Sequence, residues 1–199
     1  MFYTVSKGYF PNFTPKFQMI NRITGNYMKV LIVVDMQNDF VDGALGTSEA
    51  MHIVEPVKAK IATYKANGDA IFYTQDTHTE QYLETQEGKR LPVTHCIKGT
   101  PGWDLVPGVY LDGCPLIEKP AFGSLELAEK ISRLESVEFI ELVGLCTDIC
   151  VISNALIVKA RMPEIPIRVD ASCCAGVTPE SHRNALQAMK MCQIEILNE

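Results

Sequence analysis

VEFIELVGLCTDICV, residues 137–151, predicts a buried strand that leads directly into a helix. The first half of this stretch is short and almost continuously apolar, which is the pattern of a strand covered on both faces. The second half places Cys146 and Cys150 where the chain leaves the strand, with Thr147 as a candidate N-cap. A strand followed at once by a helix is typical of α/β folds with a parallel sheet.

The same alternation recurs from residue 28 to the end of the chain. Strands are predicted at 29–35, 70–76, 115–118, 137–143, 166–170 and 194–197, and helices at 50–66, 124–134, 148–160 and 180–191. Three of the helices are expected to begin at Ser124, Thr147 and Thr178, and the first to end at Gly68. We therefore expect an α/β fold, a three-layer α/β/α sandwich around a mostly parallel, Rossmann-like central sheet.

Length, composition and charge narrow the possible functions. The 199 residues are enough for one domain with a sizeable core, and 47% hydrophobic with 21% charged residues is ordinary for a soluble globular protein. The formal net charge of -6 provides no basic surface, so we expect a small-molecule partner and neither nucleic acid nor membrane. Seven irregularly spaced cysteines, and no apolar run of about 20 residues, indicate a reduced, cytoplasmic protein.

Residues 1–27 differ from the rest of the chain. They are rich in aromatic residues, contain no acidic residue and show no clear period, and Met28 stands directly before the first predicted strand. We expect 28–199 to form the domain, with 1–27 as an N-terminal extension that is either non-native or disordered. The alternative, an ordered arm that pairs with another subunit, stays open.

Polar residues follow the predicted strands at the edge where α/β proteins place their sites. Asp35, Asp76 and Lys119 end the first three strands, and the cysteine turn follows the fourth. With Thr147 as the N-cap, Cys150 falls at the third helical position, where backbone N–H groups and nearby Lys119 would favour a thiolate. Asp35 could then accept and return a proton. Taken singly, each of these residues could equally be structural.

Three segments resemble the signature segments of the isochorismatase-like cysteine hydrolases, a superfamily that includes the nicotinamidases. They are VDMQNDFVDG at 34–43, EKPAFGS at 118–124 and GLCTDICV at 144–151, and the resemblance covers nearly all of 28–199. It implies a catalytic triad, which falls on Cys150, Lys119 and Asp35. It also implies an oxyanion hole from the backbone N–H groups of Cys146 and Cys150, with a cis peptide bond joining Leu145 to Cys146.

A second set of polar residues lies in the long connection 76–96, DTHTEQYLETQEGKRLPVTHC. Asp76, His78 and His95 are donors that suit zinc, iron or manganese, although such a histidine often satisfies only a local hydrogen bond. The segment resembles the nicotinamidase metal loop, which implies a divalent metal, zinc first, and a fourth, variable ligand.

The resemblance leaves the fourth metal ligand open among three carboxylates. Glu87 is the first choice, because the sequence from Glu87 to His95 resembles the glutamate-containing version of that loop. Glu84 and Glu80 are possible from spacing alone. No glycine-rich phosphate loop is present, so no nucleotide cofactor is expected.

The resemblance implies hydrolysis of a small carboxamide to a carboxylate and ammonia through a thioester, with nicotinamide as the first expectation. Phe40 would pack on the substrate ring, and Leu145 would also contact the substrate. Nicotinamidases commonly place an aromatic residue shortly before the last metal histidine, but 91–94 contains none. The ring clamp would therefore be weaker or supplied by Tyr82 or Trp103, although Trp103 is more simply a loop anchor packed on the core. Members of the superfamily are often homo-oligomers, so self-association is expected.

Other functions stay open. A carbamoyl or ureido amidase would use the same triad, and an isochorismatase-type hydrolase would not need the cysteine. From a different class, the chain could be a thiol-redox or non-catalytic binding module in which Cys146 and Cys150 form a reversible pair. That interpretation leaves Lys119 and Asp35 without a role. His182, in the first turn of the last helix, is expected to face solvent.

Overall fold

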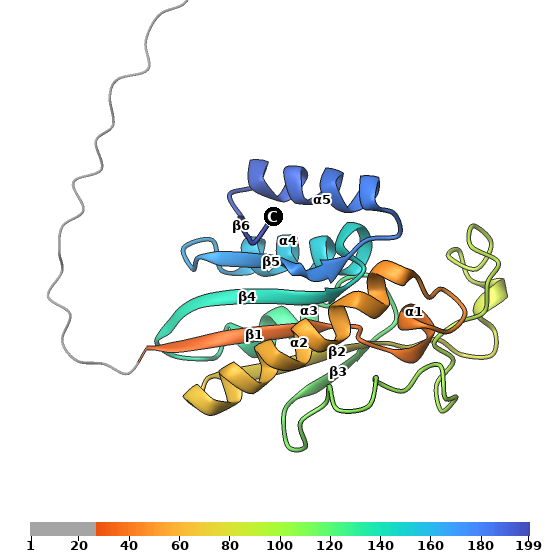
Figure 1. The fold of residues 1–199 in the computed structure, drawn as a ribbon, viewed down its shortest axis with the longest axis horizontal. Coiled ribbons are helices and arrows are strands. Elements are labelled where there is room, and N and C mark those ends of the chain that lie inside the picture. The colour runs from red at the N-terminus through yellow and green to blue at the C-terminus, as the bar shows by residue number, and fades with distance from the viewer. Residues whose placement is uncertain (1–26) are drawn as a thin grey trace, which may run out of the picture.

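The computed structural model describes residues 27–199 (Figure 1). The extension predicted at 1–27 therefore lies, except for Tyr27, outside the described residues. No helix among the described residues is long and apolar enough to cross a membrane.

The strands form one sheet in which every neighbouring pair is parallel. They are β1 (Met28–Val34), β2 (Ala70–Asp76), β3 (Leu116–Lys119), β4 (Val137–Leu145), β5 (Ile167–Ala175) and β6 (Glu195–Leu197). Their order is β3-β2-β1-β4-β5-β6, which is the strand order of a doubly wound Rossmann-like sheet. The predicted fold class is confirmed, and β4 and β5 extend further than predicted.

Helices cover both faces of the sheet (Figure 1). They are α1 (Asn38–Val41), α2 (Ser48–Asn67), α3 (Leu125–Ile131), α4 (Ile152–Arg161) and α5 (Pro179–Met191), with a 3₁₀ turn η1 (Tyr82–Glu84) and a π-helical turn η2 (Thr147–Val151). Buried side chains of α1 and α2 belong to one core, and those of α3, α4 and α5 to the other. The three predicted layers are therefore present.

The central strand β1 is an unbroken apolar run from Val30 to Val34 because both of its faces are buried. Val30, Ile32 and Val34 pack into the core under α3, α4 and α5, whereas Leu31 and Val33 pack into the core under α2. All five side chains are fully buried. Because successive residues of a strand point to opposite faces, a strand covered by helices on both sides needs apolar residues at every position.

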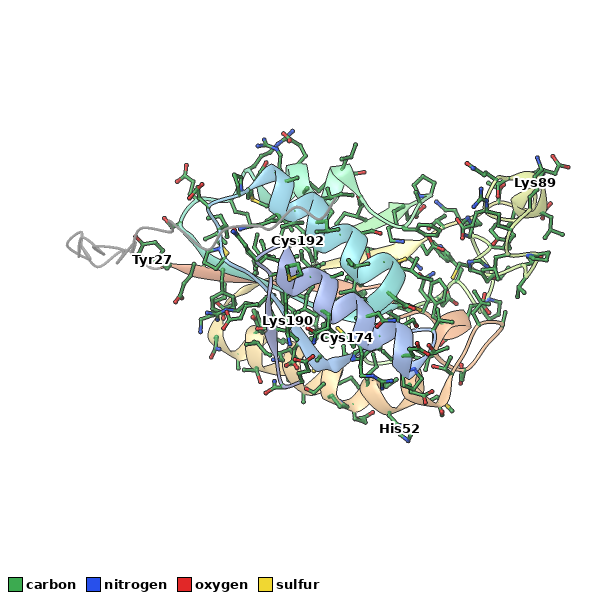
Figure 2. The ribbon with its side chains drawn as sticks, turned by 90° about the horizontal axis from the view of Figure 1, so that it is seen from above. Tyr27, His52, Lys89, Cys174, Lys190 and Cys192 are labelled. Atoms are coloured by element: carbon green, nitrogen blue, oxygen red, sulfur yellow. The ribbon has the colours of Figure 1, made fainter. Side chains whose placement is uncertain are left out.

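Most of the predicted helix ends are confirmed. Ser124 caps α3 through a hydrogen bond from the Leu127 N–H, and Thr178 caps α5 as part of a capping box. Gly68 ends α2 in the left-handed region, at φ 73°. His52, on α2, is exposed to solvent (Figure 2).

The predicted helix start at Thr147 is wrong. Cys146 occupies the N-cap position, and the chain opens into the π-turn η2, in which the Val151 N–H donates to the Cys146 carbonyl at 3.0 Å. Thr147 is fully buried, and its hydroxyl hydrogen-bonds Nδ1 of His182 on α5 at 2.8 Å. The expectation that His182 faces solvent is also wrong, because this hydrogen bond holds its ring against η2.

The strand order reverses between β1 and β4. In open α/β sheets, a crevice forms beyond the carboxyl ends of the strands at such a reversal. Asp35 follows β1 and η2 follows β4, so both come to the edge of this crevice.

Candidate active site

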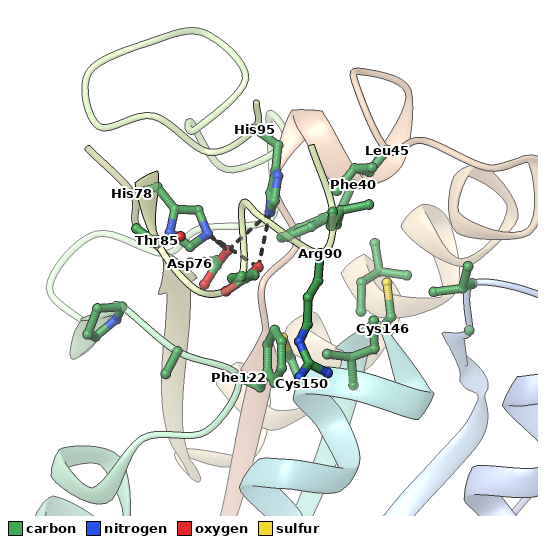
Figure 3. Close-up of a pocket in the computed structure, with 18 of the residues that line it drawn as sticks. Phe40, Leu45, Asp76, His78, Thr85, Arg90, His95, Phe122, Cys146 and Cys150 are labelled. Carbon is green, nitrogen blue, oxygen red and sulfur yellow. Dashed lines mark ion pairs between the residues drawn. The ribbon is translucent and has the colours of Figure 1, made fainter. Parts of the chain in front are cut away.

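A pocket of about 780 Å³ opens beyond the carboxyl ends of the central strands (Figure 3). Eight of the predicted site residues line it, and they are Phe40, Asp76, His78, Glu87, His95, Leu145, Cys146 and Cys150. The other two, Asp35 and Lys119, lie buried next to Cys150. The strand ends and the long connection thus converge on one cavity.

Lys119, the last residue of β3, contacts three buried side chains at once. Its Nζ lies 2.7 Å from Asp35 Oδ2, 3.2 Å from Asp76 Oδ1 and 3.4 Å from Cys150 Sγ. The Lys119 side chain is only 1% exposed, so these contacts replace water around the ammonium group. Burial alone would lower the pKa of Lys119, but Asp35, Cys150 and Asp76 together raise it, which keeps the ammonium charged.

Asp35 is held in an unusual backbone conformation at the end of β1. Its φ is 46°, in the left-handed region that a residue with a side chain rarely adopts. The Thr74 hydroxyl donates to Asp35 Oδ1 at 2.6 Å, while Oδ2 faces Lys119. Burial raises the pKa of the Asp35 carboxyl, and Lys119 opposes this rise. A carboxylate with a raised pKa accepts a proton more readily than an ordinary aspartate.

The Cys150 thiol does not have the depressed pKa that its position suggested. It is buried, and burial together with the charge of Asp35 raises its pKa well above the usual value, which Lys119 only partly opposes. The expected lowering of the Cys150 pKa is therefore wrong, because loss of solvation outweighs the nearby cation. Proton transfer to Asp35 would have to accompany any attack by the sulfur.

The turn that carries Cys150 is fixed by contacts that the sequence did not reveal. The peptide bond between Leu145 and Cys146 is cis, as expected. Asn154 Nδ2 donates to the Cys150 carbonyl at 2.8 Å, and Asn154 Oδ1 accepts from the Ser124 N–H at 3.0 Å. Asn154 thus ties the cysteine turn to the segment after β3. The sequence held one signal for this contact: Asn154 follows Cys150 by four residues, which places the two side by side on a helix.

Three predicted metal ligands lie together at one wall of the pocket. One donor atom from each of Asp76, His78 and His95 lies within 4.8 Å of the others. Glu87 Oε1 lies 3.8 Å from Nε2 of both histidines. Glu80 and Glu84 are exposed to solvent, so Glu87 is the glutamate whose position fits a shared ion.

These side chains fit a divalent metal. His78 Nε2 is buried and lies 2.9 Å from Asp76 Oδ2 and 3.8 Å from Glu87 Oε1, so this ring nitrogen faces the two carboxylates with which it would share an ion. His95 Nδ1 lies 2.7 Å from the Val93 carbonyl, which can only accept, so Nδ1 donates there and Nε2 faces Glu87 and Asp76, at 3.8 Å from each, as a ligand of a shared ion would. A set of two imidazoles and two carboxylates suits zinc, iron or manganese.

The aromatic residues do not all lie where they were expected. Phe40 lines the pocket, with its ring centroid 5.6 Å from that of His95. Tyr82 is fully buried against the edges of His78 and His95, and the Trp103 indole N–H donates to Thr77 Oγ1, so neither lines the pocket. Neither residue therefore supplies the ring clamp, and Trp103 packs on the core as the loop anchor that was the simpler interpretation.

Phe122 and Arg90 line the pocket without having been predicted. Phe122 belongs to the EKPAFGS segment, and its side chain is 45% exposed at the mouth of the cavity. The sequence could have indicated Phe122 as a pocket residue, because it lies in that segment. Arg90 could not be predicted in this way, because its orientation depends on the path of a long loop. Phe122 therefore supplies an aromatic side chain that 91–94 lacks.

Comparison with known proteins defines the class to which this fold and site belong. The family model for the isochorismatase domain matches residues 29–198. The chain therefore belongs to the isochorismatase family.

Individual relatives narrow this class to amidases. An uncharacterized isochorismatase family protein of Bacillus subtilis is 32% identical over 79% of this chain and 92% of its own. The nicotinamidase/pyrazinamidase of Mycobacterium tuberculosis is 25% identical over 85% of this chain and 98% of its own. The crystal structure of Pyrococcus horikoshii pyrazinamidase in complex with zinc superposes with a TM-score of 0.75 at 32% identity, covering 86% of this chain and 99% of that one. The chain is thus a hydrolase of non-peptide C–N bonds.

Proposed function

We propose that residues 28–199 hydrolyse a small, planar carboxamide, with nicotinamide as the first candidate, to the carboxylic acid and ammonia. The observation that carries this proposal is the buried Lys119 ammonium, which contacts Asp35, Cys150 and Asp76 at once. A buried lysine held between a thiol and two carboxylates has no evident structural purpose, whereas amide hydrolysis by a cysteine uses each group. Relatives named as nicotinamidases and pyrazinamidases support the choice of substrate.

In the proposed reaction, Cys150 Sγ attacks the amide carbonyl carbon while its proton passes to Asp35. The backbone N–H groups of Cys146 and Cys150 would stabilise the negative oxygen of the tetrahedral intermediate. Asp35 then protonates the leaving nitrogen, ammonia departs, and a thioester remains on Cys150. Water attacks the thioester while Asp35 accepts a proton, and the acid and the free thiol are released.

Lys119 and Cys146 have supporting roles in this scheme. The Lys119 charge stabilises the Asp35 carboxylate at rest and the thiolate that forms during attack. Burial raises the pKa of the Cys146 thiol to about 12, and, unlike Cys150 Sγ, this thiol has no hydrogen bond from Lys119, so it is not activated as a nucleophile. Cys146 contributes only its backbone.

Asp76, His78, His95 and Glu87 would hold the divalent metal, with zinc as the first candidate. When bound, such an ion supplies a Lewis acid at the wall of the pocket that can hold a ring nitrogen or another donor of the substrate. Phe40, Leu145 and Phe122 line the remaining space and would orient a planar ring against Cys150. The acid–base steps themselves rest on Asp35 and Cys150.

The test is release of ammonia from nicotinamide, pyrazinamide, an N-carbamoyl amino acid and an aliphatic amide by the metal-loaded protein. We expect hydrolysis of nicotinamide, loss of at least about 10³-fold of kcat in Cys150→Ala, and unchanged activity in Cys192→Ala, which replaces an exposed cysteine at the C-terminal end of α5. Turnover of the carbamoyl compound alone would keep the triad and refute nicotinamide. Absence of ammonia from every amide would refute the amidase proposal.

A further inference from the structure

Arg90 is a charged residue of the pocket that the proposed chemistry does not use. It lies on the loop between Glu87 and His95, and its side chain points into the cavity (Figure 3). Of the residues that line this pocket, all within 27–199, Arg90 is the only lysine or arginine. Its guanidinium forms no ion pair with the other residues drawn around the pocket.

The other charges near the pocket already have partners. Lys119 is shared by Asp35 and Asp76, and Asp76 and Glu87 face the two histidines of the metal set. Arg90 therefore adds a positive charge to the pocket that no carboxylate of the pocket neutralises.

The surroundings of Arg90 favour a flat, partly apolar ligand with an acidic group. Phe122, Leu91 and Val177 are exposed hydrophobic residues that also line the pocket. Arg90 is also exposed, and its planar guanidinium can bind a carboxylate through two parallel hydrogen bonds. The volume of about 780 Å³ falls within the range of about 300–1,000 Å³ that accommodates drug-sized ligands, so one ring with a carboxamide does not fill it.

We propose that Arg90 binds a carboxylate on the part of the substrate remote from the reacting amide, so that the preferred substrates are planar amides that also carry an acidic group. This inference rests on the proposed amidase function and specifies its substrate class. The reacting amide lies at Cys150, and the ion would offset the charges of Asp76 and Glu87. Among the residues that line the pocket, Arg90 is the side chain left to bind a carboxylate.

The experiment compares two amides that differ by one carboxylate, nicotinamide and 5-carbamoylpyridine-3-carboxylate, on the metal-loaded protein. In Arg90→Gln we expect kcat/KM for the acidic amide to fall roughly 10- to 100-fold, with nicotinamide changed by less than about 3-fold. Arg90→Lys should recover part of the loss, since it keeps the charge but not the planar fork. Lys89→Gln is the matched control, because Lys89 is an adjacent, exposed cation at the outer tip of the same loop (Figure 2).

A binding measurement separates failure of this inference from failure of the proposed function. Calorimetry with pyridine-3,5-dicarboxylate and with nicotinate should show that Arg90→Gln weakens the dicarboxylate by about 10-fold or more and nicotinate far less. Equal effects on the two ligands, or none, would overturn the role of Arg90 even if nicotinamide is hydrolysed. Selective weakening of the dicarboxylate in a protein that releases no ammonia from either amide would keep the anion site and refute the amidase function.

Discussion

The two halves of the site are held in different ways. Asp35, Lys119 and Cys150 stand at the ends of strands or in the turn that follows one, and all three are at most 4% exposed. Of the metal set, only Asp76 ends a strand, whereas His78, Glu87 and His95 lie in the long connection between β2 and β3. The sheet fixes the first group as part of the core. The second group depends on contacts within one loop and on the ion that it would share.

This difference predicts that the triad is coupled to folding more strongly than the metal set. Loss of a triad charge leaves buried partners that water cannot reach, while loss of Glu87, the half-buried member of the metal set, leaves a position near solvent. Two predictions test this contrast and a third tests the turn that carries Cys150, in decreasing order of expected effect.

Replacing Lys119 should have the largest effect on stability. Lys119→Met leaves the carboxylates of Asp35 and Asp76 without their buried cation, so we expect the free energy of unfolding to fall by about 3–5 kcal/mol and activity to be lost. Urea unfolding measures this change. Adding Asp35→Asn to Lys119→Met should restore part of the stability but none of the activity.

The control for Lys119 is Lys130→Met, which removes an exposed lysine paired with Glu126 on α3. Such a pair contributes about 0.5 kcal/mol or less. Equal losses of stability in Lys119→Met and Lys130→Met would contradict the view that the strand-end charges belong to the core.

Replacing Glu87 should affect metal binding more than folding. In Glu87→Gln we expect metal affinity to fall by about 10- to 100-fold, because a charged ligand is lost, with little change in the unfolding of the metal-free chain. Competition with a chromogenic chelator measures the affinity. Glu84→Gln, in an exposed glutamate of the same loop, should leave it unchanged. The opposite pattern would assign the fourth ligand to Glu84.

The contact between His182 and Thr147 should give a small, pH-dependent contribution to stability. Burial lowers the pKa of His182 in the folded chain, so the unfolded chain binds this proton more readily. The contribution is complete above the unfolded pKa of about 6.5 and is lost as the pH falls through the lower, folded value. Wild type should therefore lose more stability between about pH 8 and about pH 5 than His182→Gln does. His52→Gln, at an exposed histidine, should titrate like wild type.

The sequence predicted those features that depend on periodicity and on strand ends. Parallel strands bring their carboxyl ends to one edge, so Asp35, Asp76, Lys119 and the cysteine turn had to approach one another. Long-range contacts were not predictable in this way. The hydrogen bond between Thr147 and His182 joins residues 35 positions apart and replaces the expected cap.

Burial and loop conformation account for the remaining differences. The raised pKa of the Cys150 thiol follows from its complete loss of solvent, which spacing along a helix does not reveal. Arg90 and Phe122 reach the pocket because of the paths of two loops. The cytoplasmic location, the self-association and the roles assigned to the individual site residues stay predictions.

The position of Lys119 has a consequence for how the enzyme responds to inhibitors. One ammonium group touches both Asp35 and Asp76, and so belongs to the acid–base set and to the metal set together. An electrophile that traps the Cys150 sulfur would redistribute charge around Lys119 and so change the affinity of the metal set for its ion. Thermodynamic linkage is reciprocal, so the bound ion changes the affinity for that electrophile by the same factor. Potencies of such compounds would therefore depend on the free metal concentration of the assay, although the compounds never touch the metal.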